Sequence, residues 1–284
     1  MKTFGGIDEK YAGYDQASVL LQPILYDGTS TWGKGADKGF GQFLIAAENM
    51  ELFDIETGYE VYKKGIHILP ELSEQRSPEH LYRSTYELAQ RLIRTGKFVT
   101  FFGGEHSISI GIIRAYQEAY PGISILQLDA HTDLRPEYLG SRYNHACALH
   151  EASQAGNLVQ VGIRSMDVSE QPYLNKGKVF FAEQMAGNTD WIERSLDLLG
   201  DTVYITLDLD VFDPAVMPAT GTPEPGGMDW NTMISYLQQV FSRRKVMGFD
   251  IVELAPIPGL VYPEFLVAKL YYKMLTYKFI NHGQ

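Results

Sequence analysis

Residues Leu126-Gln-Leu-Asp129-Ala-His131-Thr-Asp133 set the pattern that organises the rest of the chain. A short apolar run ends in an acid, and two more side chains that can bind a metal follow at steps of two residues. Because alternate side chains of an extended chain lie on one side, Asp129, His131 and Asp133 can turn toward one point. Carboxylate oxygen with imidazole nitrogen suits a divalent cation such as Mn²⁺. The same residue types are also common as loop polar groups and helix caps.

Two other stretches repeat this design. Thr202-Val-Tyr-Ile-Thr-Leu-Asp208-Leu-Asp210 is an apolar run with two carboxylates, and Phe98-Val-Thr-Phe-Phe102-Gly-Gly-Glu105-His106 is one with a histidine. The carboxyl ends of parallel strands form the sheet edge at which binding sites lie. Four carboxylates and two imidazoles exceed the needs of one ion, and their like charges would repel one another without cations. We therefore predict two bridged metal ions, about 3.5–4 Å apart. The predicted ligands are His106, Asp129, His131, Asp133, Asp208 and Asp210.

Composition limits the classes of protein that this chain can belong to. It has 284 residues, of which 45% are hydrophobic, so it can bury one large core. The net charge of −11 argues against a nucleic-acid partner and is compatible with a small cationic substrate. No apolar run is long enough for a membrane span. The first residues lack the apolar core of a signal peptide, and the lone cysteine, Cys147, fits a reducing compartment, so we expect a cytoplasmic protein.

Apolar runs of strand length alternate with helical patterns along the chain. We predict strands at residues 19–26, 98–102, 123–129, 158–163, 179–181, 203–207 and 246–252. We predict helices at residues 40–49, 78–95, 107–120, 145–154, 190–199, 230–242 and 262–279. This alternation favours a mainly parallel sheet covered on both faces, so we predict one domain, residues 1–284, with a three-layer α/β/α architecture. Within it, residues 1–17 are expected to form a surface arm and residues 51–69 a hairpin.

Three motifs resemble the signatures of one enzyme family. They are Gly103-Gly-Glu-His106, Asp129-Ala-His-Thr-Asp133, and Leu207-Asp-Leu-Asp-Val-Phe-Asp-Pro214 followed by Gly221-Thr-Pro-Glu-Pro-Gly-Gly227. On these motifs the chain is identified as a member of the ureohydrolases, the arginase and agmatinase family of binuclear manganese enzymes. The likeness extends from about Leu25 to Lys278, which is nearly the whole chain. The resemblance implies an arginase-like fold.

The resemblance also implies how the ligands divide between two Mn²⁺ ions. The two implied sets are His106, Asp129, Asp133 and Asp208, and Asp129, His131, Asp208 and Asp210. Asp129 and Asp208 would then bridge the two ions. Asp133 would in addition orient the attacking nucleophile and hold its proton.

Three further residues match functional positions of the family. His145 falls where the family carries a catalytic histidine, whose imidazole suits proton transfer to a leaving amine. Agmatinases usually have His-Gly-Thr here, whereas this chain has His-Ala-Cys, and the alternative is a histidine that only opens a helix. Glu253 matches a catalytic glutamate that pairs with the substrate guanidinium as a bidentate fork. Asp167 matches an acid that binds the distal amine of the substrate, with a solvated loop acid or helix cap as the alternative.

The expected activity is the hydrolysis of agmatine to putrescine and urea, a step of polyamine biosynthesis. Arginases hold arginine with a loop rich in serine and asparagine, whereas residues 134–142 here are basic and aromatic. N1-aminopropylagmatine, guanidinobutyrate and arginine stay open as alternative substrates, and so does a catalytically inactive regulatory homologue. A binuclear metallophosphoesterase would need a downstream Gly-Asn-His turn, which the sequence lacks. Family members usually form trimers or hexamers, so a homo-oligomer is expected.

Overall fold

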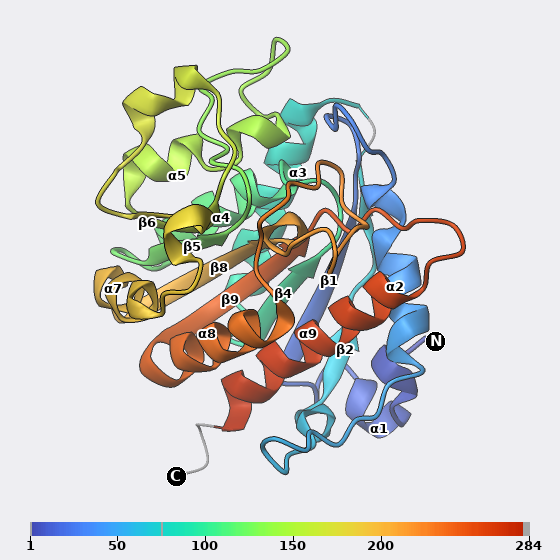
Figure 1. Cartoon of the computed structure of the whole chain (residues 1–284). Coiled ribbons are helices and arrows are strands. Elements are labelled where there is room, and N and C mark those ends of the chain that lie inside the picture. The colour runs from blue at the N-terminus through green and yellow to red at the C-terminus, as the bar shows by residue number, and fades with distance from the viewer. Residues whose placement is uncertain (1, 75, 281–284) are drawn as a thin grey trace.

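A twisted sheet of parallel strands runs through the middle of the molecule, and helices pack on both of its faces (Figure 1). The structure is a computed structural model that describes residues 2–74 and 76–280. It confirms the predicted α/β/α architecture. Over these residues the strand order is β2-β1-β4-β9-β8-β5-β6-β7, with β3 beside β1. The strands are β1 (Val19–Leu25), β2 (Ile66–Ile68), β3 (Leu72–Ser73), β4 (Phe98–Phe102), β5 (Ser124–Leu128), β6 (Asn157–Ile163), β7 (Val179–Phe181), β8 (Thr202–Asp208) and β9 (Lys245–Val252).

Two layers of helices enclose this sheet. Helices α2, α8 and α9 cover one face, where Phe43 stacks on Phe102 with ring centroids 4.1 Å apart. Helices α3, α4 and α5 cover the other face, where Tyr116 packs on Tyr204 at 4.3 Å. One sheet thus carries both cores, which supports our proposal that the chain is a single domain. The helices are α1 (Glu9–Ala12), α2 (Gly39–Ala47), α3 (Pro78–Ile93), α4 (Ile108–Ala119), α5 (His150–Ala155), α6 (Ala182–Met185), α7 (Asp190–Leu198), α8 (Trp230–Arg243) and α9 (Tyr262–Ile280). None of the helices in the described part of the chain combines the length and the apolar character that a bilayer span requires.

Pro23 lies inside β1, although proline removes a ladder donor and is usually confined to edges. On one side β1 pairs with β4 along its length. On the other side β2 ends opposite Leu21 and β3 begins opposite Ile24. Pro23 therefore falls in the gap between two partner strands, where its missing N–H breaks no pair.

Three local predictions were wrong. The segment predicted as a hairpin has only one antiparallel bridge, between Asp54 and Tyr59, because the following residues pair instead with the edge of β1 as β2. The helix predicted at residues 145–154 is divided into a 3₁₀ turn, His145–Cys147, and α5. Residues 2–17 do not form a detached arm, because Phe4 is fully buried against Phe43, Tyr271 and Tyr272.

The burial of Phe4 gives a direct test of how firmly this segment is attached. We expect Phe4→Ala to lower the free energy of unfolding by about 3–5 kcal/mol, the usual cost of truncating a buried phenylalanine. Urea denaturation followed by circular dichroism would measure it. Lys2→Ala, at an exposed neighbour, is the control and should change stability by less than about 0.5 kcal/mol. A Phe4→Ala protein as stable as the control would show that the segment is an arm after all.

Candidate metal centre

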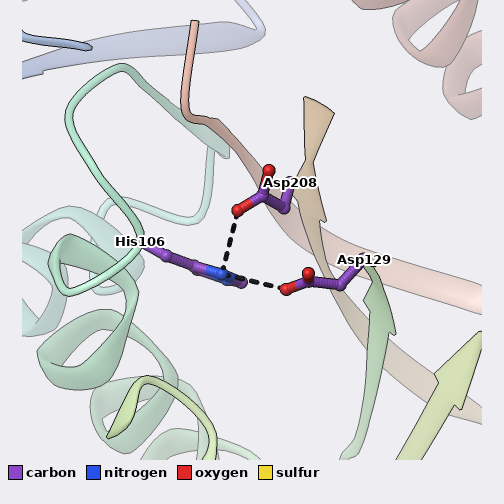
Figure 2. A group of neighbouring side chains, drawn as sticks. All are labelled: His106, Asp129 and Asp208. Atoms are coloured by element: carbon purple, nitrogen blue, oxygen red, sulfur yellow. Dashed lines mark ion pairs between the residues drawn. The ribbon is translucent and has the colours of Figure 1, made fainter. Parts of the chain in front are cut away.

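The predicted ligands and the predicted catalytic residue Glu253 converge at the carboxyl ends of four neighbouring strands. His106 follows β4, Asp129 follows β5, Asp208 ends β8, and Glu253 follows β9. These strands lie in the order β4-β9-β8-β5, so their ends form one continuous edge. Figure 2 shows the side chains of His106, Asp129 and Asp208 pointing toward one another from three of these segments.

His106 stands at the centre of the first group of ligands. Its Nδ1 lies 3.1 Å from Asp129 Oδ2, 3.0 Å from Asp133 Oδ2 and 3.3 Å from Asp208 Oδ2. This nitrogen is buried, and none of the described residues forms a well-directed hydrogen bond with it. A buried polar atom aimed at three carboxylates without a hydrogen bond is what a cation site requires.

The other ring nitrogen of His106 determines which face of the ring is free. Nε2 lies 2.9 Å from Thr206 Oγ1, and that hydroxyl donates to Asp250 Oδ1 at 2.6 Å. Because the only hydroxyl hydrogen of Thr206 goes to Asp250, Nε2 must donate its hydrogen to Thr206. When the ring is neutral, as a metal ligand must be, Nδ1 then carries its lone pair on the side of the carboxylates, the arrangement that supports a histidine ligand in metal sites.

A second group of ligands adjoins the first and shares one residue with it. His131 Nδ1 lies 2.9 Å from Asp210 Oδ2 and 3.7 Å from Asp129 Oδ1. Ligand atoms of Asp129, His131 and Asp210 lie within 4.8 Å of one another, and so do those of His106, Asp129 and Asp208. Asp129 belongs to both groups, as expected for a bridging ligand. Asp133 lies outside the tighter cluster of His106, Asp129 and Asp208, but its Oδ2 contacts His106 Nδ1 at 3.0 Å.

The electrostatics of these side chains show that they carry an excess of buried negative charge. Burial, with Asp210 as the next cause, raises the pKa of Asp129 to about 7 and that of Asp208 well above its usual range. Burial alone would lower the pKa of His131, but the carboxylates of Asp210, Asp129 and Asp133 together outweigh it and raise that pKa to about 11. The protein alone therefore holds protons on this cluster near neutral pH. Divalent cations would replace those protons, so the donor set fits a hard or borderline metal pair.

Two residues of the site have strained backbone. Asp133 has φ 53° and Glu253 has φ 69°, in the left-handed region that side chains other than glycine rarely adopt. Within the described residues only Leu139, at φ 48°, shares this feature. Such strain persists where surrounding contacts impose it, and it gathers at functional sites.

Glu253 is buried beside the first group of ligands. Its Oε1 accepts the backbone N–H of His106 at 2.8 Å. Its Oε2 would lie 3.0 Å from a β-carbon placed on Gly221, so this position leaves little room for a side chain. Burial, followed by the charge of Glu105, raises the pKa of Glu253 well above its usual range. A guanidinium bound here would restore the ionised form.

His145 and Asp167 lie at the entrance of the same site. A cavity of about 250 Å³ is lined by both and by ligands of the two groups. Asp167 also caps a 3₁₀ helix, Val168–Tyr173, by accepting from Ser169 N at 3.0 Å. Asp167 therefore acts as a helix cap, the alternative given above, and its carboxylate lines the cavity at the same time.

Sequence reasoning missed several residues of this site. Arg135 and Tyr138 line the cavity, and the guanidinium of Arg135 lies 4.5 Å from the Tyr138 ring centroid. Both belong to the basic and aromatic loop at residues 134–142, which was the available signal. Thr29 contacts His145 from the glycine-rich loop at residues 27–39, 116 residues earlier in the chain, and the glycine content of that loop was the available signal.

The shared position of Asp129 predicts a large effect of one substitution on metal binding. We expect Asp129→Asn to lower bound Mn²⁺ from about two ions per chain to one or none, because it removes a charge from both groups. Elemental analysis after Mn²⁺ loading and desalting would measure the content, with circular dichroism to confirm folding. Glu137→Gln, at an exposed acid outside the cavity, should keep the wild-type content. Equal content in the two variants would contradict the assignment.

Comparisons with known proteins agree with this geometry. The model of the Arginase family matches residues 17–276. An N(1)-aminopropylagmatine ureohydrolase of Thermus thermophilus is 36% identical over 281 residues, covering 97% of this chain and 95% of that protein. One from Synechocystis is 33% identical over 280 residues, covering 95% and 92%. The crystal structure of an agmatine ureohydrolase of Thermoplasma volcanium superposes with a TM-score of 0.85 at 27% identity, covering 98% of this chain and 94% of that one. The chain belongs to the arginase family and is an amidinohydrolase.

Proposed function

We propose that the protein hydrolyses the guanidino end of a linear polyamine, so that water and the substrate give urea and the free amine. Membership of the arginase family supports the reaction class. The observation that carries the proposal is the cluster of two imidazoles and four carboxylates that shares one cavity with Glu253 and His145. We propose N1-aminopropylagmatine as the substrate, because the two relatives described above bear that name. Agmatine, the substrate that the sequence predicts, is the second candidate, supported by the name of the Thermoplasma volcanium neighbour.

We propose two Mn²⁺ ions as the cofactor. The residues that would hold them are His106, Asp129, His131, Asp133, Asp208 and Asp210. Bound there, the ions would supply a water of lowered pKa, the strong nucleophile that a charge-delocalised guanidinium carbon needs.

The remaining residues would bind and orient the substrate and move protons. Glu253 would pair with the guanidinium, mainly through Oε2, because Oε1 already accepts from His106 N. Asp133 would orient the nucleophile and accept its proton. His145 would protonate the leaving amine, which departs only as a neutral molecule.

The entrance of the cavity has one carboxylate suited to the cationic tail of such a substrate. Asp167 Oδ1 accepts from Ser169 N and Oγ, whereas Oδ2 lies 3.5 Å from Arg135 Nη2. That separation is long for a charged hydrogen bond, so Oδ2 has capacity for a substrate ammonium. Arg135 also lies 3.6 Å from the buried Glu170, which offers it a second partner when Asp167 binds substrate.

The expected homo-oligomer stays a prediction.

The reaction class is tested by a side-by-side substrate panel. With saturating Mn²⁺ we expect urea from N1-aminopropylagmatine and agmatine, with the higher kcat/KM for the former. Guanidinobutyrate and arginine should react at least about tenfold more slowly, because a carboxylate tail is not matched by Asp167. Colorimetric urea detection would measure all four rates. No urea from any compound would reject the proposed reaction and favour an inactive homologue.

The role of Asp167 is tested by its amide variant. We expect Asp167→Asn to raise KM for agmatine by about two- to fivefold with little change in kcat, since an exposed ion pair with the tail ammonium contributes only weakly to binding. Butylguanidine, which lacks the tail ammonium, should show no change in KM. Glu137→Gln, an exposed acid on the neighbouring loop, is the matched control. A KM shift of the same size for butylguanidine would show that Asp167 acts only as a helix cap.

A further inference from the structure

We propose that Thr29 is a positioning residue that fixes which ring nitrogen of His145 carries a hydrogen, and so presents Nε2 of that ring as the proton-transferring atom. The inference deepens the proposed function, because it rests on His145 acting in the cavity. Thr29 belongs to the loop after β1, Glu105 to the turn after β4, and His145 to a separate 3₁₀ turn. Hydrogen bonds join these three segments.

The contacts of the Thr29 hydroxyl account for all of its hydrogen-bonding capacity. Oγ1 donates to Glu105 Oε1 at 2.7 Å, accepts the backbone N–H of His145 at 2.9 Å, and lies 3.1 Å from His145 Nδ1. A hydroxyl has one hydrogen and two lone pairs. With the hydrogen given to Glu105 and one lone pair used by His145 N, the contact with Nδ1 requires an Nδ1–H donor.

Glu105 acts in this network as an acceptor on both oxygens. Oε1 accepts the backbone N–H of Thr29 at 3.0 Å as well as its hydroxyl, and Oε2 accepts the backbone N–H of Ser107 at 2.8 Å. Glu105 is fully buried and Thr29 is 8% exposed, so water does not compete for these bonds. Glu105 Oε1 at 2.7 Å is both nearer and, as a carboxylate oxygen, a stronger acceptor than His145 Nδ1 at 3.1 Å, so the hydrogen of Thr29 goes to Glu105.

The consequence for His145 is a single preferred tautomer. If the hydrogen were on Nε2, the lone pair of Nδ1 would face the lone pair of Thr29 Oγ1, which is repulsive. In the neutral ring the hydrogen thus lies on Nδ1, and Nε2 is free to receive a proton. Nδ1–H stays bonded to Thr29 when the ring becomes cationic, so proton transfer at Nε2 needs no rearrangement. The Tyr138 ring, edge-on to His145 with centroids 6.3 Å apart, lies against it.

Kinetics of Thr29 variants would test this role. We expect Thr29→Val, which keeps the shape but loses the hydroxyl, to lower kcat for the best substrate by roughly tenfold. KM and Mn²⁺ content should stay near wild type. Thr29→Ser, which keeps the hydroxyl, should stay within about twofold of wild type. Thr85→Val, a buried threonine on α3 away from the cavity, is the control for an isosteric change and should keep wild-type kcat.

A spectroscopic readout tests the tautomer without turnover. In the full-length chain without paramagnetic Mn²⁺, ¹⁵N NMR of labelled histidine rings should show His145 with hydrogen on Nδ1, assigned by the signal lost in His145→Gln. Thr29→Val should mix the tautomers, and Thr29→Ser should not. Hydrogen on Nε2 in the wild type would overturn the inference, even if Thr29→Val failed to fold. So would wild-type kcat in Thr29→Val, or equal loss in Thr29→Ser and Thr29→Val. Absence of urea from the wild type would instead reject the proposed function, and the NMR result would still decide the tautomer.

Discussion

The structure depends on one electrostatic constraint, the burial of four carboxylates at a single edge of the sheet. Asp129, Asp208 and Asp210 are less than 5% exposed and Asp133 is 7% exposed. Like charges at such spacing cannot all ionise in a dry environment without cations. Burial first, and then the repulsion by Asp210, raises the pKa of Asp129 and of Asp208. A fold that keeps these side chains in place must therefore obtain its stability elsewhere, in the two apolar cores on the faces of the sheet.

Backbone N–H groups decide where each carboxylate points. Asp208 Oδ1 accepts from Asp210 N at 2.9 Å, which leaves Oδ2 directed toward His106. Asp210 Oδ1 accepts from Ala130 N at 2.9 Å, which leaves Oδ2 directed toward His131. In both cases one oxygen is held by the chain and the other is presented to the centre. This division orients the ligand atoms before any cation arrives, the arrangement that a preorganised metal site requires.

The sequence could place the candidate ligands at this edge, because each motif that contains them begins where an apolar run of strand length ends. Once β4, β5 and β8 are parallel strands of one sheet, their carboxyl ends must share an edge. Contacts formed by loops and the terminus carry no such signal. Thr29 donates to Glu105, which is 76 residues away in the sequence, and Phe4 packs in the core against Tyr271. The polar sequence around Phe4 does not predict this burial. The left-handed backbone of Asp133 and Glu253 was equally unpredictable, since neither is a glycine.

The residues proposed to carry out the reaction and the residues proposed to select the substrate lie in different parts of the fold. Apart from His145, which lies in a 3₁₀ turn, the groups assigned to chemistry lie at or shortly after strand ends, where neighbouring strands fix their positions. The groups at the entrance, Arg135, Tyr138 and Asp167, belong to segments outside the sheet. Their interactions are partly exposed and long, so a change of one side chain there alters tail recognition at small energetic cost. A related protein can thus keep all of the candidate metal ligands and still accept a different amine. The sequence motifs therefore identify the reaction class, whereas the side chains of the two entrance loops determine which substrate binds.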